Sequence, residues 1–263
     1  MFSQRKIAMA NELTAKTALV TGSGRGIGRA IALAYAAAGM KVVCSARTSS
    51  EIDAVAQSIK DDGGEALAVI CDVTDSAQVQ ALCDAAHSTF GSIDILVVNA
   101  GMASEGVTVE DTSTDVWRQV IELNLVAAMD QCRAAIPYLR QGDGGKILFT
   151  GSGIGRIAAP GKSAYACSKA GVAMLCRVLA QELRDDNIAV NEIIPGPVRT
   201  RMTGIDEECE GRDAQGAPIL SVPGEWIKNP QDVAPLALYL AGLPNNGPTG
   251  QVFSLAGRDL GRI

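Results

Sequence analysis

Short apolar segments alternate with longer segments of helical periodicity along nearly the whole chain, and this alternation leaves few folds open. Several of the short segments are nearly all apolar, which is typical of central strands covered on both faces of a sheet. The sequence predicts strands over Thr17–Val20, Lys41–Ser45, Ala66–Cys71, Ile93–Asn99, Lys146–Thr150, Ala189–Ile194 and Gln251–Leu255.

The segments between these strands have helical patterns. In the first of them, Ile27 and Ile31 share one face at helical spacing. Asn229-Pro230 begins the last with a cap residue followed by proline at the first helical position. The pattern predicts one α/β domain over residues 1–263, with a single doubly wound parallel sheet and helices on both faces. The predicted helices are Ile27–Ala38, Ser49–Lys60, Ala77–Phe90, Thr114–Leu139, Tyr165–Arg184 and Pro230–Leu240.

The charge and the cysteine content exclude several classes of function. The 263 residues carry 23 basic and 29 acidic side chains, so no overall basic field attracts nucleic acid or anionic lipid. The seven cysteines include no CxxC pair, and the single histidine is His87. These features indicate buried thiols in a reducing compartment and argue against a zinc site or a Ser-His-Asp hydrolase. With no secretory signal or membrane span visible, we expect a soluble cytoplasmic protein without a metal.

A glycine-rich turn follows the first predicted strand and opens the first predicted helix. Its spacing, Gly22-xxx-Gly26-x-Gly28, departs from the dinucleotide pattern GxGxxG. Glycine permits a tight turn and a close approach to phosphate, while the helix N-terminus supplies N–H donors. The place of the turn between a strand and a helix favours phosphate binding over a purely structural turn. The residues predicted to bind are Gly22, Ser23, Arg25, Gly26, Ile27 and Gly28.

The end of the second predicted strand distinguishes NAD from NADP. NAD sites place an acid there, about twenty residues after the turn, to hold the ribose 2′-hydroxyl. Here the strand ends Cys44-Ser45-Ala46-Arg47, so the acid is absent and Arg47 offers a guanidinium that suits a 2′-phosphate. Arg25 in the glycine turn is a second candidate. We therefore expect NADP(H); the alternative is that both arginines are ordinary surface charges.

Tyr165 and Lys169 are four positions apart in a predicted helix and therefore share a face. A phenol with a pKa near 10 is a poor proton donor or acceptor at neutral pH. A nearby ammonium favours the phenolate and lowers that pKa. The two residues are thus a candidate acid–base pair, although this spacing also occurs by chance.

Further motifs occur in order around this pair. Asn99-Ala100-Gly101 follows the fourth predicted strand, Ser152 precedes Tyr165 by thirteen residues, and Pro195-Gly196-Pro197-Val198-Arg199-Thr200 follows the sixth strand. Together with the glycine turn and the Tyr-Lys pair, they resemble the short-chain dehydrogenase/reductase family over essentially the whole chain. The resemblance implies a Rossmann fold and hydride transfer between NADP(H) and a carbonyl or alcohol.

The resemblance also implies a role for each matching residue. Tyr165 is the general acid in reduction, and Lys169 lowers its pKa and binds the nicotinamide ribose. Ser152 hydrogen-bonds the substrate oxygen, and Asn124 positions a water that links the lysine to solvent. Two alternatives stay open: Asp72 as a strand-end cap, and Asn124 as a polar helix residue bonded to backbone. The other implied cofactor contacts are Asp72 and Val73 at the adenine, Asn99, Ala100 and Gly101 in the cleft, and Pro195, Val198 and Thr200 towards the carboxamide.

Three functions fit these motifs. The first is an NADP-dependent carbonyl reductase or alcohol dehydrogenase acting on a small molecule. The second is a 3-oxoacyl-carrier-protein reductase, whose acidic protein substrate docks on basic residues. We expect Asp143, Asp185 and Asp186 to lie beside the active-site mouth and, together with the acids Asp206, Glu207, Glu208 and Glu210 of the segment 201–225, to oppose such docking. The third is a non-catalytic NADP sensor, which is disfavoured because the serine, tyrosine and lysine are all retained.

Two further expectations concern the surface. Residues 201–225 are rich in glycine, proline and acids, and a stretch this long and irregular predicts a substrate lid. The resemblance implies a homo-tetramer or dimer formed through the segments Thr114–Leu139 and Tyr165–Arg184. The expected partners are therefore a small carbonyl or alcohol and further copies of the chain, with no nucleic acid and no membrane.

Overall fold

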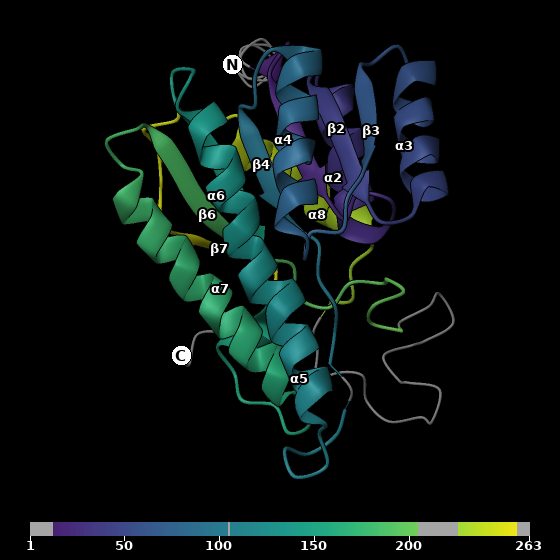
Figure 1. The fold of residues 1–263 in the computed structure, drawn as a ribbon, viewed down its shortest axis with the longest axis vertical. Helices are drawn as coiled ribbons and strands as arrows, with labels where there is room; N and C mark the ends of the chain where they lie inside the picture. Colours follow the sequence, from purple (N-terminus) through teal and green to yellow (C-terminus); the bar gives the residue numbers. More distant parts are fainter. Residues whose placement is uncertain (1–12, 105, 205–225, 257–263) are drawn as a thin grey trace.

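The structure, a computed structural model, describes residues 13–104, 106–204 and 226–256. Within them, seven strands form one sheet in the order β3-β2-β1-β4-β5-β6-β7, and every neighbouring pair is parallel (Figure 1). This arrangement confirms the predicted doubly wound parallel sheet. The strands are β1 (Thr17–Thr21), β2 (Lys41–Ala46), β3 (Ala66–Ile70), β4 (Ile95–Val98), β5 (Gly145–Thr150), β6 (Ile188–Ile194) and β7 (Val252–Ser254).

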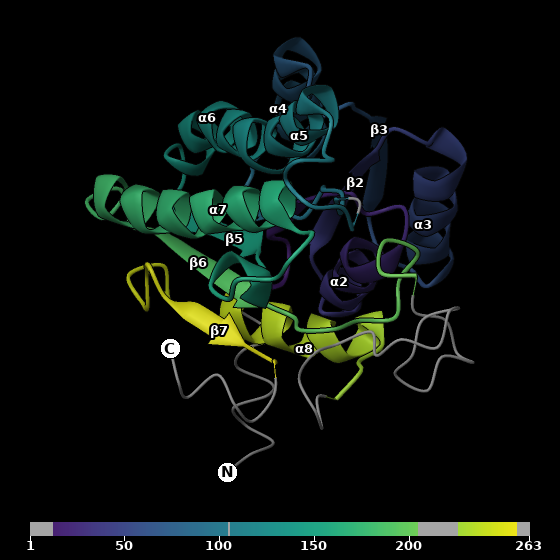
Figure 2. The ribbon, with the colours of Figure 1, turned by 90° about the horizontal axis from the view of Figure 1, so that it is seen from below.

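Helices cover both faces of this sheet, as the two views in Figures 1 and 2 show. None of the described helices is long and apolar enough to cross a membrane. One face carries α4 (Ser76–Phe90), α6 (Ala127–Leu139) and α7 (Ser163–Glu182), and the other carries α2 (Gly26–Ala37), α3 (Ser49–Asp61) and α8 (Pro230–Ala241).

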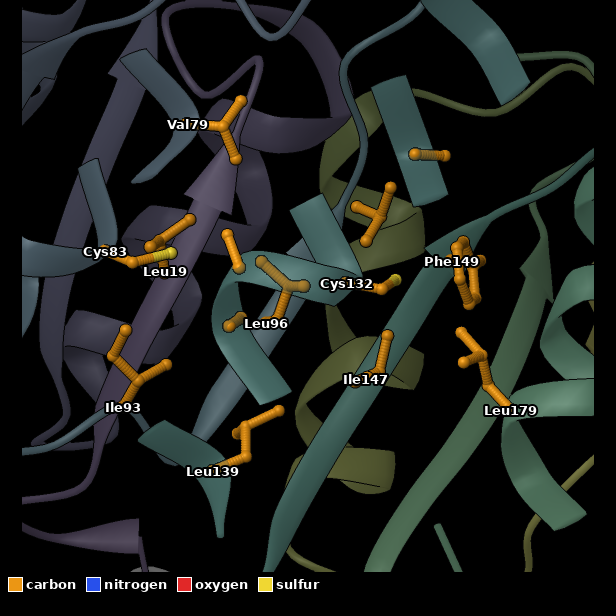
Figure 3. Packing of buried hydrophobic residues seen from close by; sticks show 14 of the residues in the cluster. Leu19, Val79, Cys83, Ile93, Leu96, Cys132, Leu139, Ile147, Phe149 and Leu179 are labelled. Carbon is orange, nitrogen blue, oxygen red and sulfur yellow. The ribbon is translucent and has the colours of Figure 1, made fainter. Parts of the chain in front are cut away.

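Side chains of the strands alternate between two cores, one under each layer of helices. Leu19, Leu96 and Ile147, from β1, β4 and β5, pack with residues of α4, α6 and α7 (Figure 3). Their neighbours along the strands, such as Val20 and Val97, pack with α2, α3 and α8. Fully burying an aliphatic side chain of this size contributes about 1.5–3 kcal/mol. Both helix layers are therefore fixed to the sheet by its two-residue periodicity.

The path of the chain at the middle of the sheet determines where a site forms. After β1 the chain passes into α2 on one face, whereas after β4 it passes into α5 (Thr114–Ile121) and then α6 on the other face. Adjacent parallel strands whose connections leave to opposite faces open a crevice outside their carboxyl ends. A ligand site is therefore expected beside the ends of β1 and β4.

The segment predicted as one helix over Thr114–Leu139 is interrupted. α5 ends at Ile121, a π-helical segment covers Glu122–Val126, and α6 begins at Ala127. The prediction of one continuous helix is therefore wrong in its middle. A π segment inserts one residue into a turn, and the apolar pattern of a 3.6-residue period does not reveal it.

Candidate active site

A cleft of about 1430 Å³ lies at the carboxyl edge of the sheet. It is larger than the roughly 300–1,000 Å³ usual for drug-sized ligands. Most of the predicted site residues come together on its wall, although they are spread over almost 180 positions of sequence. Those on the wall are Gly22, Arg25, Gly26, Ile27, Arg47, Asp72, Val73, Asn99, Ala100, Gly101, Ser152, Tyr165, Lys169, Pro195, Val198 and Thr200.

The glycine turn presents bare backbone to this cleft. Gly22 and Gly26 have φ angles of +63° and +57°, a conformation that favours glycine. A Cβ atom on Gly22 would also lie only 3.1 Å from the Cα atom of Ala100. No described side chain caps the N-terminus of α2, and its first turn holds no acid. The first N–H groups of α2 are thus available to an anion, and the turn fits the pyrophosphate of a dinucleotide.

Ser23 and Gly28 lie behind the turn and not on the cleft wall. Ser23 is fully buried, and its Oγ accepts a hydrogen bond from the backbone N–H of Ser45 in β2 (2.8 Å). A Cβ atom on Gly28 would overlap the carbonyl oxygen of Gly22 and crowd Asn99. These two residues shape the turn from behind, and their predicted contact with the cofactor stays a prediction.

Arg25 and Arg47 both line the cleft, and Arg47 directly follows β2, where the sequence predicted a 2′-phosphate. Arg25 Nη1 donates a hydrogen bond to Glu51 Oε1 (3.0 Å). Glu51 is in the first turn of α3, so this ion pair draws the guanidinium of Arg25 towards the end of β2. Glu51 belongs to no motif, and its contact with Arg25 spans 26 positions, so the sequence alone does not reveal it.

Asp72 stabilises a turn and also lines the cleft. Its Oδ1 accepts hydrogen bonds from the backbone N–H of Thr74 (3.0 Å) and from Thr74 Oγ1 (2.8 Å). These bonds are the main reason that the pKa of Asp72 lies below its ordinary value, and the nearby charge of Arg47 adds to the effect. Asp72 therefore closes the turn after β3, as the alternative interpretation held, and it also faces the cleft.

Asn99 connects the carboxyl ends of three strands. Its Nδ2 donates to the carbonyl oxygen of Thr21 (2.9 Å), and its Oδ1 accepts from Thr150 Oγ1 (3.1 Å). Thr21 Oγ1 accepts in turn from the backbone N–H groups of Asn99 (3.1 Å) and Ala100 (3.2 Å). This network fixes the floor of the cleft where β1, β4 and β5 end. Thr21 and Thr150 had no motif to mark them in the sequence.

Ser152, Tyr165 and Lys169 meet at the end of β5. Lys169 is only 7% exposed, and its Nζ donates to the carbonyl oxygen of Thr150 (2.8 Å). The same Nζ lies 5.9 Å from the centre of the Tyr165 ring. Ser152 Oγ accepts from the backbone N–H of Ile154 (3.2 Å), which fixes the serine at the start of the short turn Gly153–Gly155.

Burial shifts the pKa values of both Tyr165 and Lys169. It raises the pKa of Tyr165 above its ordinary value of 10, and a hydrogen bond with Ser152 opposes this. It lowers the pKa of Lys169 to about 8, and the charge of Glu192 opposes that shift. Burial therefore outweighs the hydrogen bond at Tyr165, and the lowering of its pKa by Lys169 stays a prediction. Tyr165 is protonated at neutral pH, which is the state that donates a proton.

Asn124 lies in the π segment, is 2% exposed and is not on the cleft wall. Its Oδ1 accepts from the backbone N–H of Met102 (2.8 Å), and its Nδ2 donates to the Met102 carbonyl (2.9 Å) and to Ser168 Oγ (3.1 Å). The amide thus ties the chain after β4 to α7. These bonds match the alternative of a polar residue bonded to backbone, and the water-positioning role stays a prediction.

Three expectations remain, on Thr200, on the lid and on metal binding. Thr200 packs beside Gly26: a Cβ atom added to that glycine would lie 3.5 Å from Cγ2 of Thr200. Of the predicted lid 201–225, residues 205–225 lie outside the described residues. Within the described part of the chain, no three His, Cys, Asp or Glu side chains gather closely enough to hold a metal ion.

The acids expected beside the mouth lie at the opposite edge of the sheet. Asp143 comes just before β5, and Asp185 and Asp186 lie between the end of α7 and the start of β6. The 20 residues of α7 separate them from the first turn, where Tyr165 lies, by about 30 Å. Asp186 is moreover paired with Arg140 (2.7 Å). The expectation about the position of these three acids is wrong, so their charge does not oppose docking at the carboxyl ends of the strands. The acids at 206, 207, 208 and 210 lie outside the described residues.

Comparison with known proteins identifies the family. A family model described as short chain dehydrogenase matches residues 16–210. This chain belongs to the short-chain dehydrogenase family. It is therefore an oxidoreductase of alcohol and ketone groups, and members of this family use nicotinamide cofactors.

Individual relatives cover nearly the whole chain. A 3-oxoacyl-(acyl-carrier-protein) reductase of Synechocystis is 37% identical over 248 residues, covering 93% of this chain and 97% of the relative. A 7alpha-hydroxysteroid dehydrogenase of Escherichia coli is 34% identical, with 93% and 94% covered. The crystal structure of a dehydrogenase/reductase from Sinorhizobium meliloti superposes with a TM-score of 0.82 at 32% identity, covering 94% of this chain and 97% of the other. Relatives of similar identity are thus named for different substrates, so the family alone does not identify the substrate of this chain.

Proposed function

We propose that this short-chain dehydrogenase transfers a hydride between NADP(H) and a small carbonyl compound or secondary alcohol. The observation that carries the proposal is the cleft itself. The same cleft is lined by Ser152, Tyr165 and Lys169, by the bare backbone of the glycine turn, and by Arg25 and Arg47. A dinucleotide needs sites for a nicotinamide, a pyrophosphate and an adenosine, and these three groups of residues are the candidates for them.

Residues of the protein supply the proton and stabilise the negative charge that develops during the reaction. The nicotinamide, when bound, supplies the hydride. Tyr165 donates its phenolic proton to the substrate oxygen as negative charge develops there, and Ser152 donates a hydrogen bond to the same oxygen. With a pKa of about 8, Lys169 is mainly charged at pH 7, so its ammonium stabilises the phenolate that Tyr165 leaves behind.

The proposal is tested with purified protein and a panel of ketones, aldehydes, sugars and acyl thioesters. NADPH oxidation with a free carbonyl compound supports it. A second candidate is reduction of 3-oxoacyl groups on a carrier protein, because a relative 37% identical has that name and Asp143, Asp185 and Asp186 lie at the edge of the sheet opposite the cleft. Turnover confined to carrier-bound thioesters would select this candidate. NADPH binding without turnover on any substrate would indicate the sensor.

The cofactor preference gives a quantitative prediction. Charge-assisted contacts to a 2′-phosphate contribute about 1.5–3 kcal/mol each, so we expect kcat/KM to favour NADPH over NADH by at least about tenfold. Arg47→Leu reduces this preference, mainly through the KM for NADPH, because the phosphate is remote from the reacting atoms. Ala46→Asp combined with Arg47→Leu inverts it, since a carboxylate repels the phosphate and accepts from a ribose hydroxyl.

Steady-state kinetics with both cofactors measure this preference. Arg29→Leu is the matched control, because Arg29 is an exposed arginine of α2 outside the cleft. A wild type that prefers NADH, or an Arg47→Leu variant with an unchanged KM for NADPH, would show that the arginines do not bind the phosphate.

We also propose that the protein forms a homo-tetramer or dimer through α6 and α7. Met129 of α6 and Met174 and Val178 of α7 are 37%, 54% and 43% exposed, and Met174 and Val178 share a face of their helix. Exposed apolar side chains clustered on two long helices are typical of an interface.

Met174→Lys is expected to shift the mass of the particle in solution towards the monomer, measured by light scattering. Ile70→Lys is the control, because Ile70 is also exposed but lies at the end of the edge strand β3. An unchanged mass for Met174→Lys would move the interface away from α7.

A further inference from the structure

A largely buried ion pair, Arg156–Glu192, lies against the backbone that leads into Ser152. Arg156, which follows the turn Gly153–Gly155, donates from Nη1 to Glu192 Oε1 (3.1 Å) and from Nη2 to Glu192 Oε2 (2.6 Å). The side chain of Glu192 is 1% exposed and that of Arg156 is 18% exposed. The surface pair Arg140–Asp186 is 50% and 30% exposed. Arg156 and Glu192 are therefore joined by two parallel bonds and shielded from solvent, which fixes both the distance and the direction of the guanidinium.

The backbone around Ser152 is built to fit this pair. A Cβ atom on Gly151 would overlap Oε1 of Glu192, so the carboxylate lies against the backbone just before the serine. A Cβ atom on Gly155 would lie 2.7 Å from the backbone carbon of Lys169, so the turn also packs directly on α7. The loop Gly151–Gly155 is thus held between β6 and α7, and Arg156 fastens its end to Glu192.

The same carboxylate acts on the catalytic lysine. Its negative charge favours the charged form of Lys169 and opposes the lowering of the pKa by burial. Hydrogen bonding to Glu192 also raises the pKa of Arg156, so the guanidinium remains charged. Glu192 therefore touches the serine loop through Arg156 and acts on Lys169 through its field.

We propose that Arg156 and Glu192 are positioning residues, which hold the loop Gly151–Gly155 so that the Ser152 hydroxyl is aligned with Tyr165. Stability alone gives no reason for the pair, because burying two charges costs about as much as their attraction returns, and apolar residues would pack as well. A rigid two-bond link between the loop Gly151–Gly155 and the interior strand β6 does explain the pair. This inference rests on the proposed function, since it assigns Ser152 to the substrate oxygen.

A double-mutant cycle tests whether the pair acts through Ser152. Arg156→Lys keeps the charge but loses the two-bond geometry, and a misplacement of about 1 Å lowers turnover by roughly 10²-fold. We expect kcat to fall by about 10- to 100-fold when Ser152 is present and by less than about threefold in the Ser152→Ala background, with a nearly unchanged KM for NADPH. Arg140→Lys, in the surface pair, should leave kcat unchanged in both backgrounds.

Equal losses of kcat with and without Ser152 would overturn the proposal, because they would mean that the pair does not act through the serine. Glu192→Asp keeps the charge that acts on Lys169 and goes through the same cycle, so the result does not depend on one variant folding. If the wild type shows no turnover on any substrate, the proposed function fails, and a second measurement still tests the positioning.

That measurement is hydrogen exchange on the protein without cofactor. The backbone N–H groups of Gly151, Gly155 and Ile157 are bonded to the carbonyl oxygens of Ile193, Ser152 and Gly153. In Arg156→Lys we expect residues 151–157 to exchange at least about tenfold faster, while α2 and α8 keep their wild-type rates. Unchanged exchange over 151–157 would overturn the proposal whatever the activity.

Discussion

Replacing Tyr165 with phenylalanine is expected to lower kcat for carbonyl reduction by about 10²–10⁴-fold, the usual contribution of a positioned general acid. The change removes only the hydroxyl and leaves the ring to pack at the end of the cleft. Because burial raises the pKa of this phenol, the wild-type group is fully protonated at neutral pH and available as the donor. NADPH binding, measured by fluorescence titration, should stay close to that of the wild type.

Tyr239→Phe is the matched control. Tyr239 is a half-exposed tyrosine of α8 that does not line the cleft, so its hydroxyl should be dispensable for turnover. If Tyr165→Phe retained near-normal turnover on a good substrate, the proton would have to come from another group, and the proposed chemistry would be wrong.

Lys169→Met is expected to lower kcat by on the order of 10²–10³-fold and also to raise the KM for NADPH. Both change together because the ammonium stabilises the phenolate and, by resemblance to the family, binds the nicotinamide ribose. The wild type should lose reductase activity as the pH rises through about 8, the pKa of this lysine, because the ammonium becomes neutral above it. The variant should lack that decline.

Lys146 provides the control for this substitution. It is 7% exposed, as Lys169 is, but it lies in β5 near its amino end and bonds to Asn245. Lys146→Met should change the stability of the fold without changing the KM for NADPH or the pH profile. A Lys169→Met variant with altered kcat and a wild-type KM for NADPH would limit the lysine to the proton transfer.

Local spacing allowed much of the site to be predicted from the sequence. Tyr165 and Lys169 are one helical turn apart, and the glycine turn follows directly from its place between β1 and α2. Short apolar segments and the 3.6-residue period likewise predicted each described strand and most helix limits to within a few residues. These features depend on neighbours in sequence, which a single chain displays.

The parts that could not be predicted depend on contacts between distant segments. Arg156 meets Glu192 across 36 positions, and Asn124 meets Met102 across 22. The burial that raises the pKa of Tyr165 also arises only once the chain has folded. Ser23 looks like a phosphate ligand in the motif, but in three dimensions its hydroxyl bonds to β2. Spacing predicts which elements meet, whereas side-chain partners require the packing.

The π segment at Glu122–Val126 has a consequence for how this chain tolerates changes in length. A π segment accommodates one extra residue in a wide turn, so deleting one residue there would restore a continuous α-helix and leave the face of α6 that packs on the sheet nearly unchanged. The buried alanines of α6 would still face the sheet, whereas Asn124 would leave the wide turn and lose Met102. A single-residue deletion should therefore be better tolerated by the fold over these five residues than within α6, where it would rotate all that follows by about 100°, and a deletion scan read out by stability should show this difference.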